Sequence, residues 1–336
     1  MWNDKNNGRF IVYECTSSGS GLGDRIKGIA TTFLIALLTD RAFLINWNYP
    51  ASIDHILVPN MIDWRVGDLS EYRMLPIFKS YRMNTFEHAI NYADVDFDET
   101  LTSNHRNASK PSMIITRFNE LLPILYSDRY RSKLQRLGLW RMKETDFLGC
   151  IFEFLFRPSE QVLVQMKHFY DRNPVLSNSY VIGIQSRIGG GEIGDGTLIP
   201  SPRQVWFRDC ALELTNNYQV DIHAQQQQQQ KYNRVMAEMR PVAWFLTSDS
   251  SLFKDLLMDK HNQARSRTPI VQYGKQIRSL DAKQNTASDM VDIMAEYFIL
   301  QQSNELVISA SGFGESAGQI TGKKVNHFRH NLHMCQ

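Results

Sequence analysis

Three polar motifs in the second half of the sequence each follow a run of apolar, strand-forming residues. They are QSRIGGGEIGDG at 185–196, TSDSS at 247–251 and SASGFGES at 309–316. Glycines let a backbone approach an anion closely, and guanidinium and backbone N–H groups donate hydrogen bonds to phosphate oxygens. The motifs therefore predict a site for a phosphorylated ligand.

Arg187 is the first candidate for contact with that ligand, because its guanidinium group offers forked donors to a phosphate. The alternative is a surface arginine that pairs with Glu192 or Asp195. Asp249 suits the base or ribose of a nucleotide, and its alternative role is to cap the helix predicted to follow it. Ser311 precedes another predicted helix, and we expect it to hold a second face of the same phosphate together with residues 312–314.

A further glycine-rich segment, SGSGLGD at 18–24, lies in the first half of the chain. The β-branched and aromatic run Phe10–Cys15 predicts a strand before it. From Asp24 to Leu38 apolar residues recur every three or four positions, which predicts a helix with one wide buried face. Ala42–Trp47 predicts a second strand, so the segment is a strand–loop–helix–strand unit whose loop suits a phosphate.

Strands and helices continue to alternate along the chain, which predicts parallel sheets with ligands at the carboxyl ends of their strands. The Asn173-Pro174 pair interrupts the pattern and marks the predicted domain boundary, giving domains 1–173 and 174–336. Ser288 is the expected N-cap of a long helix over 286–303. The other expected elements are strands at 112–118, 180–187, 242–250 and 305–311, a mostly helical region at 127–170, and helices from Pro202 and from Ser251.

Composition excludes several classes of protein. The 336 residues are 43% hydrophobic and 21% charged, with a net charge of +2, so neither nucleic acid nor an anionic membrane attracts the whole chain strongly. The apolar segment within 28–39 is too short to cross a bilayer, and no signal peptide opens the sequence. The compartment stays open: the cytoplasm, or a secretory lumen such as the Golgi if the chain is the soluble part of a longer protein.

Cysteine spacing excludes a zinc site of the CxxC type. Cys15, Cys150, Cys210 and Cys335 are scattered, and a chain of this size does not need a disulfide framework. The sequence therefore predicts buried free thiols.

Three further segments have an unusual composition but no predicted catalytic role. The six glutamines at 225–230 are expected in a surface loop. The alternating aspartates of DVDFD at 94–98 are expected in a solvated loop, and HFRHNLH at 327–333 in a terminal tail. A metal site is the alternative for each of the last two, although three histidines at that spacing do not share one helical face.

The glycine loop alone also suggests a dinucleotide-dependent oxidoreductase. Its G-x-G-x-G spacing differs from the dinucleotide fingerprint, and Asn46 stands where an acidic residue would end the second strand. A phosphate-binding loop of the G-K-S/T type is absent from the sequence. This interpretation is therefore disfavoured.

Four blocks of the sequence together resemble GDP-fucose-dependent fucosyltransferases. The blocks are GLGDRIKGIATTFLIALLTDRAFLI, VIGIQSR, FLTSDSSLFKDLL and MAEYFILQQSNELVISASGFGESA, in the family's order. The similarity spans roughly residues 10 to 320 and is nearest to the plant xyloglucan-type and nodulation-factor enzymes. It implies an α/β, GT-B-like fold of two Rossmann-like domains facing a central cleft, with the acceptor on the first and GDP-fucose mainly on the second.

The resemblance also implies roles for individual residues. Arg187 matches the strand-end arginine that contacts the β-phosphate, and Gln185 a position that lines the nucleotide site. Asp249 matches the acidic residue that contacts the guanine or its ribose. The remaining donor-binding positions implied by the resemblance are Gly21, Leu22, Gly23, Asp24 and Arg25 in the first loop, and Ser311, Gly312, Phe313 and Gly314 in the second.

Two departures from the family pattern bear on linkage and on the catalytic base. Relatives specific for the α1,6 linkage carry a second arginine where this chain has Ile188, which favours an α1,2-type linkage. Asp195 matches the acidic base of α1,6-type relatives by spacing, and Glu192 is the alternative.

The expected reaction is an inverting transfer of fucose from GDP-fucose to a hydroxyl of a glycan or polysaccharide, with no metal or other cofactor. Neither nucleic acid nor membrane is an expected partner of this chain. The alternative is a catalytically weak or inactive module of the same fold that binds a nucleotide sugar or a glycan.

Overall fold

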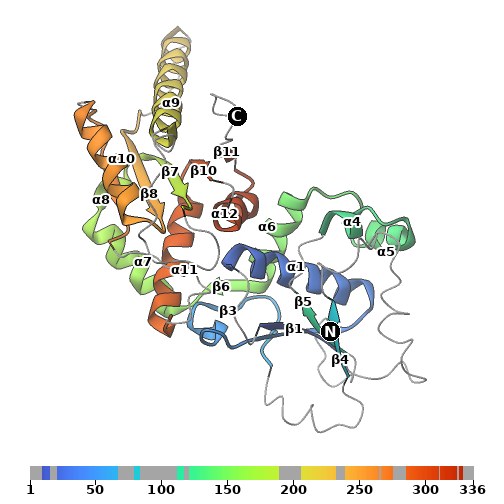
Figure 1. Cartoon of the computed structure of the whole chain (residues 1–336). Coiled ribbons are helices and arrows are strands. Elements are labelled where there is room, and N and C mark those ends of the chain that lie inside the picture. Colours follow the sequence, from blue (N-terminus) through green and yellow to red (C-terminus); the bar gives the residue numbers. More distant parts are fainter. Residues whose placement is uncertain are drawn as a thin grey trace. The chain divides into compact units, whose positions relative to one another are not determined.

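The computed structural model divides the chain into two compact units, each of which contains a parallel sheet (Figure 1). Unit 1 comprises residues 1–160, 283–290 and 319–322, and unit 2 the rest. The main division therefore falls after residue 160, the first residue of α7, whereas the boundary expected from the sequence follows residue 173. The structure describes residues 10–15, 21–66, 79–83, 112–116, 121–188, 206–231, 239–264, 266–274, 285–309, 311–323 and 325–327.

The sheet of unit 1 has the strand order β2-β1-β5-β4, and all its strand pairs are parallel. Its strands are β1 (Phe10–Cys15), β2 (Ala42–Trp47), β4 (Lys79–Met83) and β5 (Ser112–Thr116). Every residue of β2 is buried, as expected of a strand covered on both faces. The predicted strand–loop–helix–strand unit is thereby confirmed.

Helix α1 (Leu22–Leu38) connects β1 to β2 and begins two residues earlier than predicted. Gly21 is its N-cap, and Phe33 packs edge-on against Phe43 of β2 with ring centroids 5.2 Å apart. The hydroxyls of Thr31 and Thr32 donate to carbonyls four residues earlier, which lets a nearly all-round buried helix tolerate polar side chains. The apolar periodicity therefore predicts this helix well.

The rest of unit 1 is a set of short elements. They are η2 (Ile53–His55), β3 (Leu57–Pro59), α4 (Leu121–Leu125), η3 (Asp128–Tyr130), α5 (Arg131–Arg136), α6 (Glu144–Leu155) and β6 (Phe156–Pro158). β6 pairs with β3 in an antiparallel ladder, so the mostly helical region predicted over 127–170 also contains one short strand. The fully buried Trp64 holds the junction of α6 and β6, because its indole Nε1 donates to the carbonyl of Leu155 at 2.7 Å.

The sheet of unit 2 has the strand order β11-β10-β7-β8-β9 and is also parallel throughout. Its strands are β7 (Tyr180–Ser186), β8 (Val242–Ser248), β9 (Ile270–Gln272), β10 (Glu305–Ile308) and β11 (Val325–His327). β9 and β11 are further strands that the sequence did not predict. The helices of unit 2 are α7 (Glu160–Arg172), α8 (Pro174–Ser177), α9 (Trp206–Lys231), α10 (Ser251–Gln263), α11 (Ala287–Gln302) and α12 (Gly312–Thr321).

Both faces of this sheet are covered by helices. Phe207 of α9 and Phe253 of α10 pack with Trp244 of β8 in one apolar cluster. On the other face Phe169 of α7 lies edge-on to Phe245, with ring centroids 5.6 Å apart. Alternate side chains of β8 thus pack against helices on opposite faces of the sheet, as in a doubly wound domain.

Helix α11 is capped by a residue other than the one predicted. The Oγ1 of Thr286 accepts from the N–H of Asp289 at 3.2 Å, and the carboxylate of Asp289 accepts from the N–H of Thr286 at 2.7 Å. This reciprocal pair is a capping box. Ser288, the predicted cap, lies inside the helix.

The glutamine run 225–230 is also placed differently from the prediction, because it continues α9 as helix instead of forming a loop. Glutamine is a good helix former, so a helix already started by packed residues such as Phe207 extends through it. The expected exposure is confirmed where side chains are described, since Gln225 and Gln227 are exposed.

The cysteines depart from the expectation of buried free thiols. Cys15 is free and buried, but Cys150 is free and exposed, and Cys210 of α9 is disulfide-bonded. Residues 94–98 and 328–333 lie outside the described residues. Among the residues that are described, no helix is long and apolar enough to span a bilayer.

Candidate functional site

The carboxyl ends of β7, β8 and β10 bring the predicted residues of unit 2 to one edge of its sheet. Ser186 is in register with Ser248 of β8, and Gln185 with Ile308 of β10. Arg187, Asp249 and Ser311 follow these strand ends within a few residues. Ligands of parallel sheets bind at this edge, so its polar groups form the candidate site.

The segment that follows β7 is held by both neighbouring strand ends. The N–H of Arg187 donates to the Oγ of Ser309 at 2.9 Å, and the N–H of Ile188 donates to Oδ1 of Asp249 at 2.8 Å. Arg187 itself is half-buried. The backbone that carries the guanidinium group is therefore fixed from two sides.

Asp249 does not cap the helix that follows it. The N-cap of α10 is Ser250, whose Oγ accepts from the N–H of Phe253 at 3.2 Å. The capping alternative for Asp249 is thus wrong, and its carboxylate is instead directed to the backbone after Arg187. A carboxylate can accept several hydrogen bonds, so this contact does not exclude a ligand.

Gln185 packs against the second glycine motif, whose residues 312–314 form the first turn of α12 and not the predicted loop. Gln185 is 5% exposed, and a Cβ added to Gly314 would lie 2.6 Å from its Oε1, closer than real side chains come. Phe313 lies in the same helical turn, with its ring edge-on to Tyr297 at 5.1 Å between centroids. A glycine is therefore required at 314, as the loop motif implies.

Two buried hydroxyls at this edge have no hydrogen-bond partner among the residues that the structure describes. They belong to Ser186, 1% exposed at the end of β7, and to Ser311, 5% exposed directly before α12. A buried hydroxyl without a partner is costly, so such groups point to a ligand that would satisfy them. The N–H groups at the start of α12, beginning with Gly312, lie beside Ser311 and favour an anion there. Ser186 was not predicted, although its place next to Arg187 was a usable signal.

A buried acid, Glu296 of α11, also escaped prediction. It is fully buried, and burial raises its pKa to about 7, although the nearby charge of Lys254 lowers it. Within an apolar run of the sequence, a single glutamate carries no signal of burial, because only the packing of α11 on the sheet shows it. The group changes charge near neutral pH.

The first glycine loop reaches the described residues only at its end. Helix α1 begins with Leu22 and Gly23, after the N-cap Gly21. Asp24 lies half-exposed in the first turn, where its negative charge interacts favourably with the positive end of the helix dipole. Arg25 is fully buried within unit 1: its guanidinium group lies 4.7 Å from the ring centroid of Trp47 and donates to the carbonyl of Tyr49. These contacts suit a residue that positions the loop. Contact of this loop with a donor stays a prediction.

Both acidic candidates for the catalytic base, Glu192 and Asp195, lie outside the described residues, and so does a pairing of Arg187 with either of them. Within the described part of the chain, no three His, Cys, Asp or Glu side chains gather as a metal site requires.

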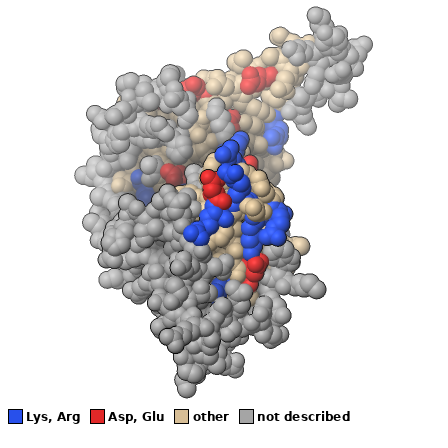
Figure 2. Space-filling model, turned by 90° about the vertical axis from the view of Figure 1, so that its right-hand side faces the viewer, with Lys and Arg blue, Asp and Glu red and all other residues tan. Residues whose placement is uncertain are grey.

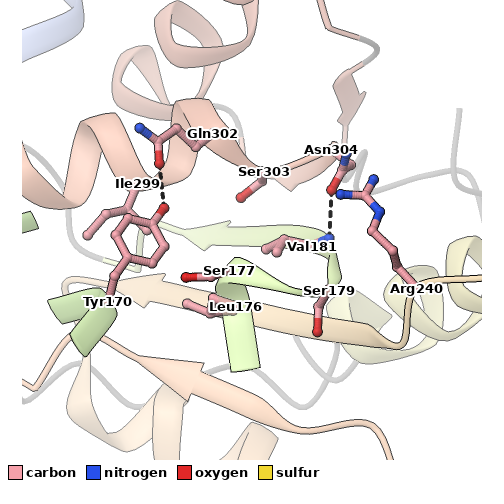
Figure 3. A pocket seen from close by; sticks show the side chains of 10 residues that line it. All are labelled: Tyr170, Leu176, Ser177, Ser179, Val181, Arg240, Ile299, Gln302, Ser303 and Asn304. Carbon is pink, nitrogen blue, oxygen red and sulfur yellow. Dashed lines mark hydrogen bonds between the residues drawn. The ribbon is translucent and has the colours of Figure 1, made fainter. Parts of the chain in front are cut away.

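Arg187 does not line the described cavities of unit 2. One, of about 310 Å³, is at the amino end of β7 and is lined by Val181, Arg240 and Asn304 among others (Figure 3). Asn304 accepts from the N–H of Val181 at 2.8 Å, and Tyr170 donates to Gln302 at 2.6 Å. Burial raises the pKa of Tyr170 to about 12, so this phenol stays protonated at neutral pH. A second cavity, of about 540 Å³, is lined by residues of α7 and α11 and by Tyr273 and Gly274 after β9.

Comparison with known proteins gives a match in structure alone. No family model and no curated protein sequence matches the chain. The Arabidopsis thaliana FUT1, solved as a mutant with GDP, superposes with a TM-score of 0.59 at 18% identity, over 97% of this chain and 72% of that one. The α1,6-fucosyltransferase NodZ, soaked with GDP-fucose, gives a TM-score of 0.50 at 14% identity, over 96% and 95%. NodZ from Bradyrhizobium, in a selenomethionine form, gives 0.50 at 13% over the same shares.

The chain has the fold of these fucosyltransferases. The predicted α/β, GT-B-like class is confirmed, and so is the resemblance on which it depended. At these identities the fucosyltransferase fold alone is shared, so activity depends on the residues at the sheet edge of unit 2.

Proposed function

We propose that this chain is a glycosyltransferase that moves fucose from GDP-fucose to a hydroxyl of a glycan acceptor. One observation carries the proposal. Arg187 and the unpartnered hydroxyl of Ser311 lie at the same sheet edge, in a fold shared with fucosyltransferases solved with GDP or GDP-fucose.

The donor diphosphate would lie between Arg187 and the start of α12. As the bond between fucose and GDP breaks, negative charge develops on the β-phosphate oxygen. Arg187, the hydroxyl of Ser311 and the N–H groups of α12 would stabilise that charge. Asp249 holds the backbone next to Arg187, which would help to position the guanidinium group before the reaction.

The acceptor would be activated by a carboxylate. Asp195 or Glu192 would take the proton from the acceptor hydroxyl as its oxygen attacks the anomeric carbon opposite GDP, which inverts the configuration. Ile188, instead of a second arginine, supports an α1,2-type linkage over α1,6. The proposed chemistry uses no metal ion, because the arginine and backbone donors supply the positive charge.

Transfer of radiolabelled fucose from GDP-fucose to an array of glycans tests this function. We expect label on at least one glycan, unchanged in the presence of a chelator. The Arg187→Ala variant should lose activity by at least about 100-fold, the usual effect of removing a charge-stabilising donor. The matched control is Arg267→Ala, an exposed arginine of the same unit, which should keep full activity.

Two outcomes would contradict this scheme. Loss of transfer in chelator, restored by a divalent cation, would contradict the metal-free reaction. A protein that GDP stabilises against heat but that labels no glycan would favour the alternative, a module that binds a nucleotide sugar without turnover.

A further inference from the structure

One segment of unit 1, residues 127–143, which spans η3, α5 and the turn after them, carries a net positive charge. This segment contains six Lys and Arg residues and one Asp, a net charge of +5, whereas the whole chain has +2. The remainder of the molecule is therefore net negative. Figure 2 shows Lys and Arg gathered on the side of the molecule where α4 and α5 lie in Figure 1. Such clustering raises the local concentration of anions.

Only part of this charge is neutralised locally. Lys133 pairs with Asp40, and Arg131 pairs with Asp128. Arg136, Arg141 and Lys143 are exposed, and none of them has an ion pair with a described residue. Three cationic groups thus stand available to a ligand in solution.

Trp140 holds two of the guanidinium groups of the segment. The guanidinium carbon of Arg131 lies 5.1 Å from the ring centroid of Trp140, and that of Arg141 lies 5.5 Å from it. Cations over an indole ring are attracted to its π-face, which reduces the freedom of long side chains. The guanidinium groups of Arg131 and Arg141 are therefore partly preorganised, which lowers the entropy cost of binding an anion.

The backbone at Arg141 is strained, and its N–H donates to the carbonyl of Leu125 at 3.2 Å. Its φ is 57°, in the left-handed region that favours glycine. The N–H of Met142 donates to the carbonyl of Leu139 at 3.0 Å, so Arg141 occupies the third position of a tight turn, where glycine or asparagine is usual. An exposed arginine at such a position costs stability, and this cost points to a role for its side chain.

We propose that the segment 127–143 is a binding site for a polysaccharide that carries carboxylate groups. A planar guanidinium group can donate two parallel hydrogen bonds to a planar carboxylate. Several such contacts along one polysaccharide chain increase the overall affinity. The choice of a glycan rests on the proposed function. A membrane surface fits less well, since no large apolar side chain of this fully described segment is exposed, as an interfacial helix requires.

Binding of polygalacturonate to the full chain, measured without GDP-fucose, tests the site. We expect saturable binding that weakens as salt is raised, and no binding of neutral dextran. The triple variant Arg136→Gln/Arg141→Gln/Lys143→Gln should bind at least about 10-fold more weakly. The control Arg157→Gln, an exposed arginine elsewhere in unit 1, should bind as the natural chain does. Absence of fucose transfer would leave this result intact, so the two proposals can fail separately.

Two variants at position 141 separate a guanidinium site from bulk charge and from a role in folding. Arg141→Lys keeps the charge but lacks the fork, and should bind several-fold more weakly. Arg141→Gly relieves the strained φ, and should melt at the same or a higher temperature while binding is reduced. The proposal is overturned if Arg141→Lys binds as well as the natural chain, or if phosphatidylserine vesicles bind where polygalacturonate does not.

Discussion

The carboxylate of Asp249 links the ends of two strands, because its Oδ1 accepts from the N–H of Ile188 at 2.8 Å. Replacement by alanine leaves that N–H without its acceptor and frees the backbone beside Arg187. We expect Asp249→Ala to weaken GDP binding about 10-fold, consistent with a loss of roughly 1.4 kcal/mol. Asp249→Asn keeps an oxygen that can accept this bond and should bind within about threefold of the natural chain. Equal loss in both variants would indicate that charge matters, not the hydrogen bond.

Gly314 packs closely against Gln185 and Ile308, so a variant at 314 tests the packing of the first turn of α12 without changing a charge. A methyl group at 314 would meet Oε1 of Gln185 at 2.6 Å and the side chain of Ile308 at 2.9 Å. We expect Gly314→Ala to lower the free energy of unfolding by about 1–3 kcal/mol, the usual cost of overpacking. Denaturant titration measures this.

Two further variants test the origin of the stability change expected for Gly314→Ala. Gly274→Ala meets no atom within 4 Å and should change stability little. Gln185→Ala in the same chain as Gly314→Ala removes one of the two clashes and should restore part of the loss. A double variant as unstable as Gly314→Ala alone would show that Gln185 is not the obstacle.

The residues of the site were predictable to the extent that a motif marks them. Arg187 and Ser311 stand beside glycines after apolar runs, and the structure places both at one sheet edge. The hydrogen bond from Ile188 to Asp249 was not predictable, because TSDS has two candidates for the cap of the next helix. Only the structure shows that Ser250 is the cap.

At the scale of elements, α11 carries a buried acid whose ionisation should alter stability. The pKa of Glu296 is raised from 4.5 to about 7, mainly by burial. The folded state thus binds the proton more tightly than the unfolded state, so stability falls as pH rises from 4.5 through 7. We expect Glu296→Gln to remove this dependence and to be more stable than the natural chain at pH 8, by up to about 3 kcal/mol. Melting temperatures at pH 5 and pH 8 measure it; a gain at both would contradict this origin.

The main elements follow from periodicity, and the errors have local causes. β1, α1, β2, β7 and β8 are long, apolar and bounded by turn residues, so their patterns identify them. β6 and β11 have three residues each, too few to show a period, and are fixed by pairing with distant strands. The cap of α11 was misplaced by two residues because Thr286 and Ser288 are both capable of capping.

At the scale of the whole molecule, two parallel sheets follow from the repeated alternation of strands and helices. The net charge of +2 gave no sign of the basic segment 127–143, because the remaining residues have a net negative charge that offsets most of it. The disulfide of Cys210 could not be predicted either, because no short spacing marks its partner.

Calorimetric titration of the full chain with GDP tests the central claim most directly, because it isolates the diphosphate site from acceptor and base. We predict one site per chain, an affinity reduced at least about 10-fold in Arg187→Ala, and an unchanged affinity in Arg267→Ala, since a charged hydrogen bond contributes about 1.5–3 kcal/mol. Equal GDP affinity in Arg187→Ala and the natural chain, or no binding to either, would contradict the account.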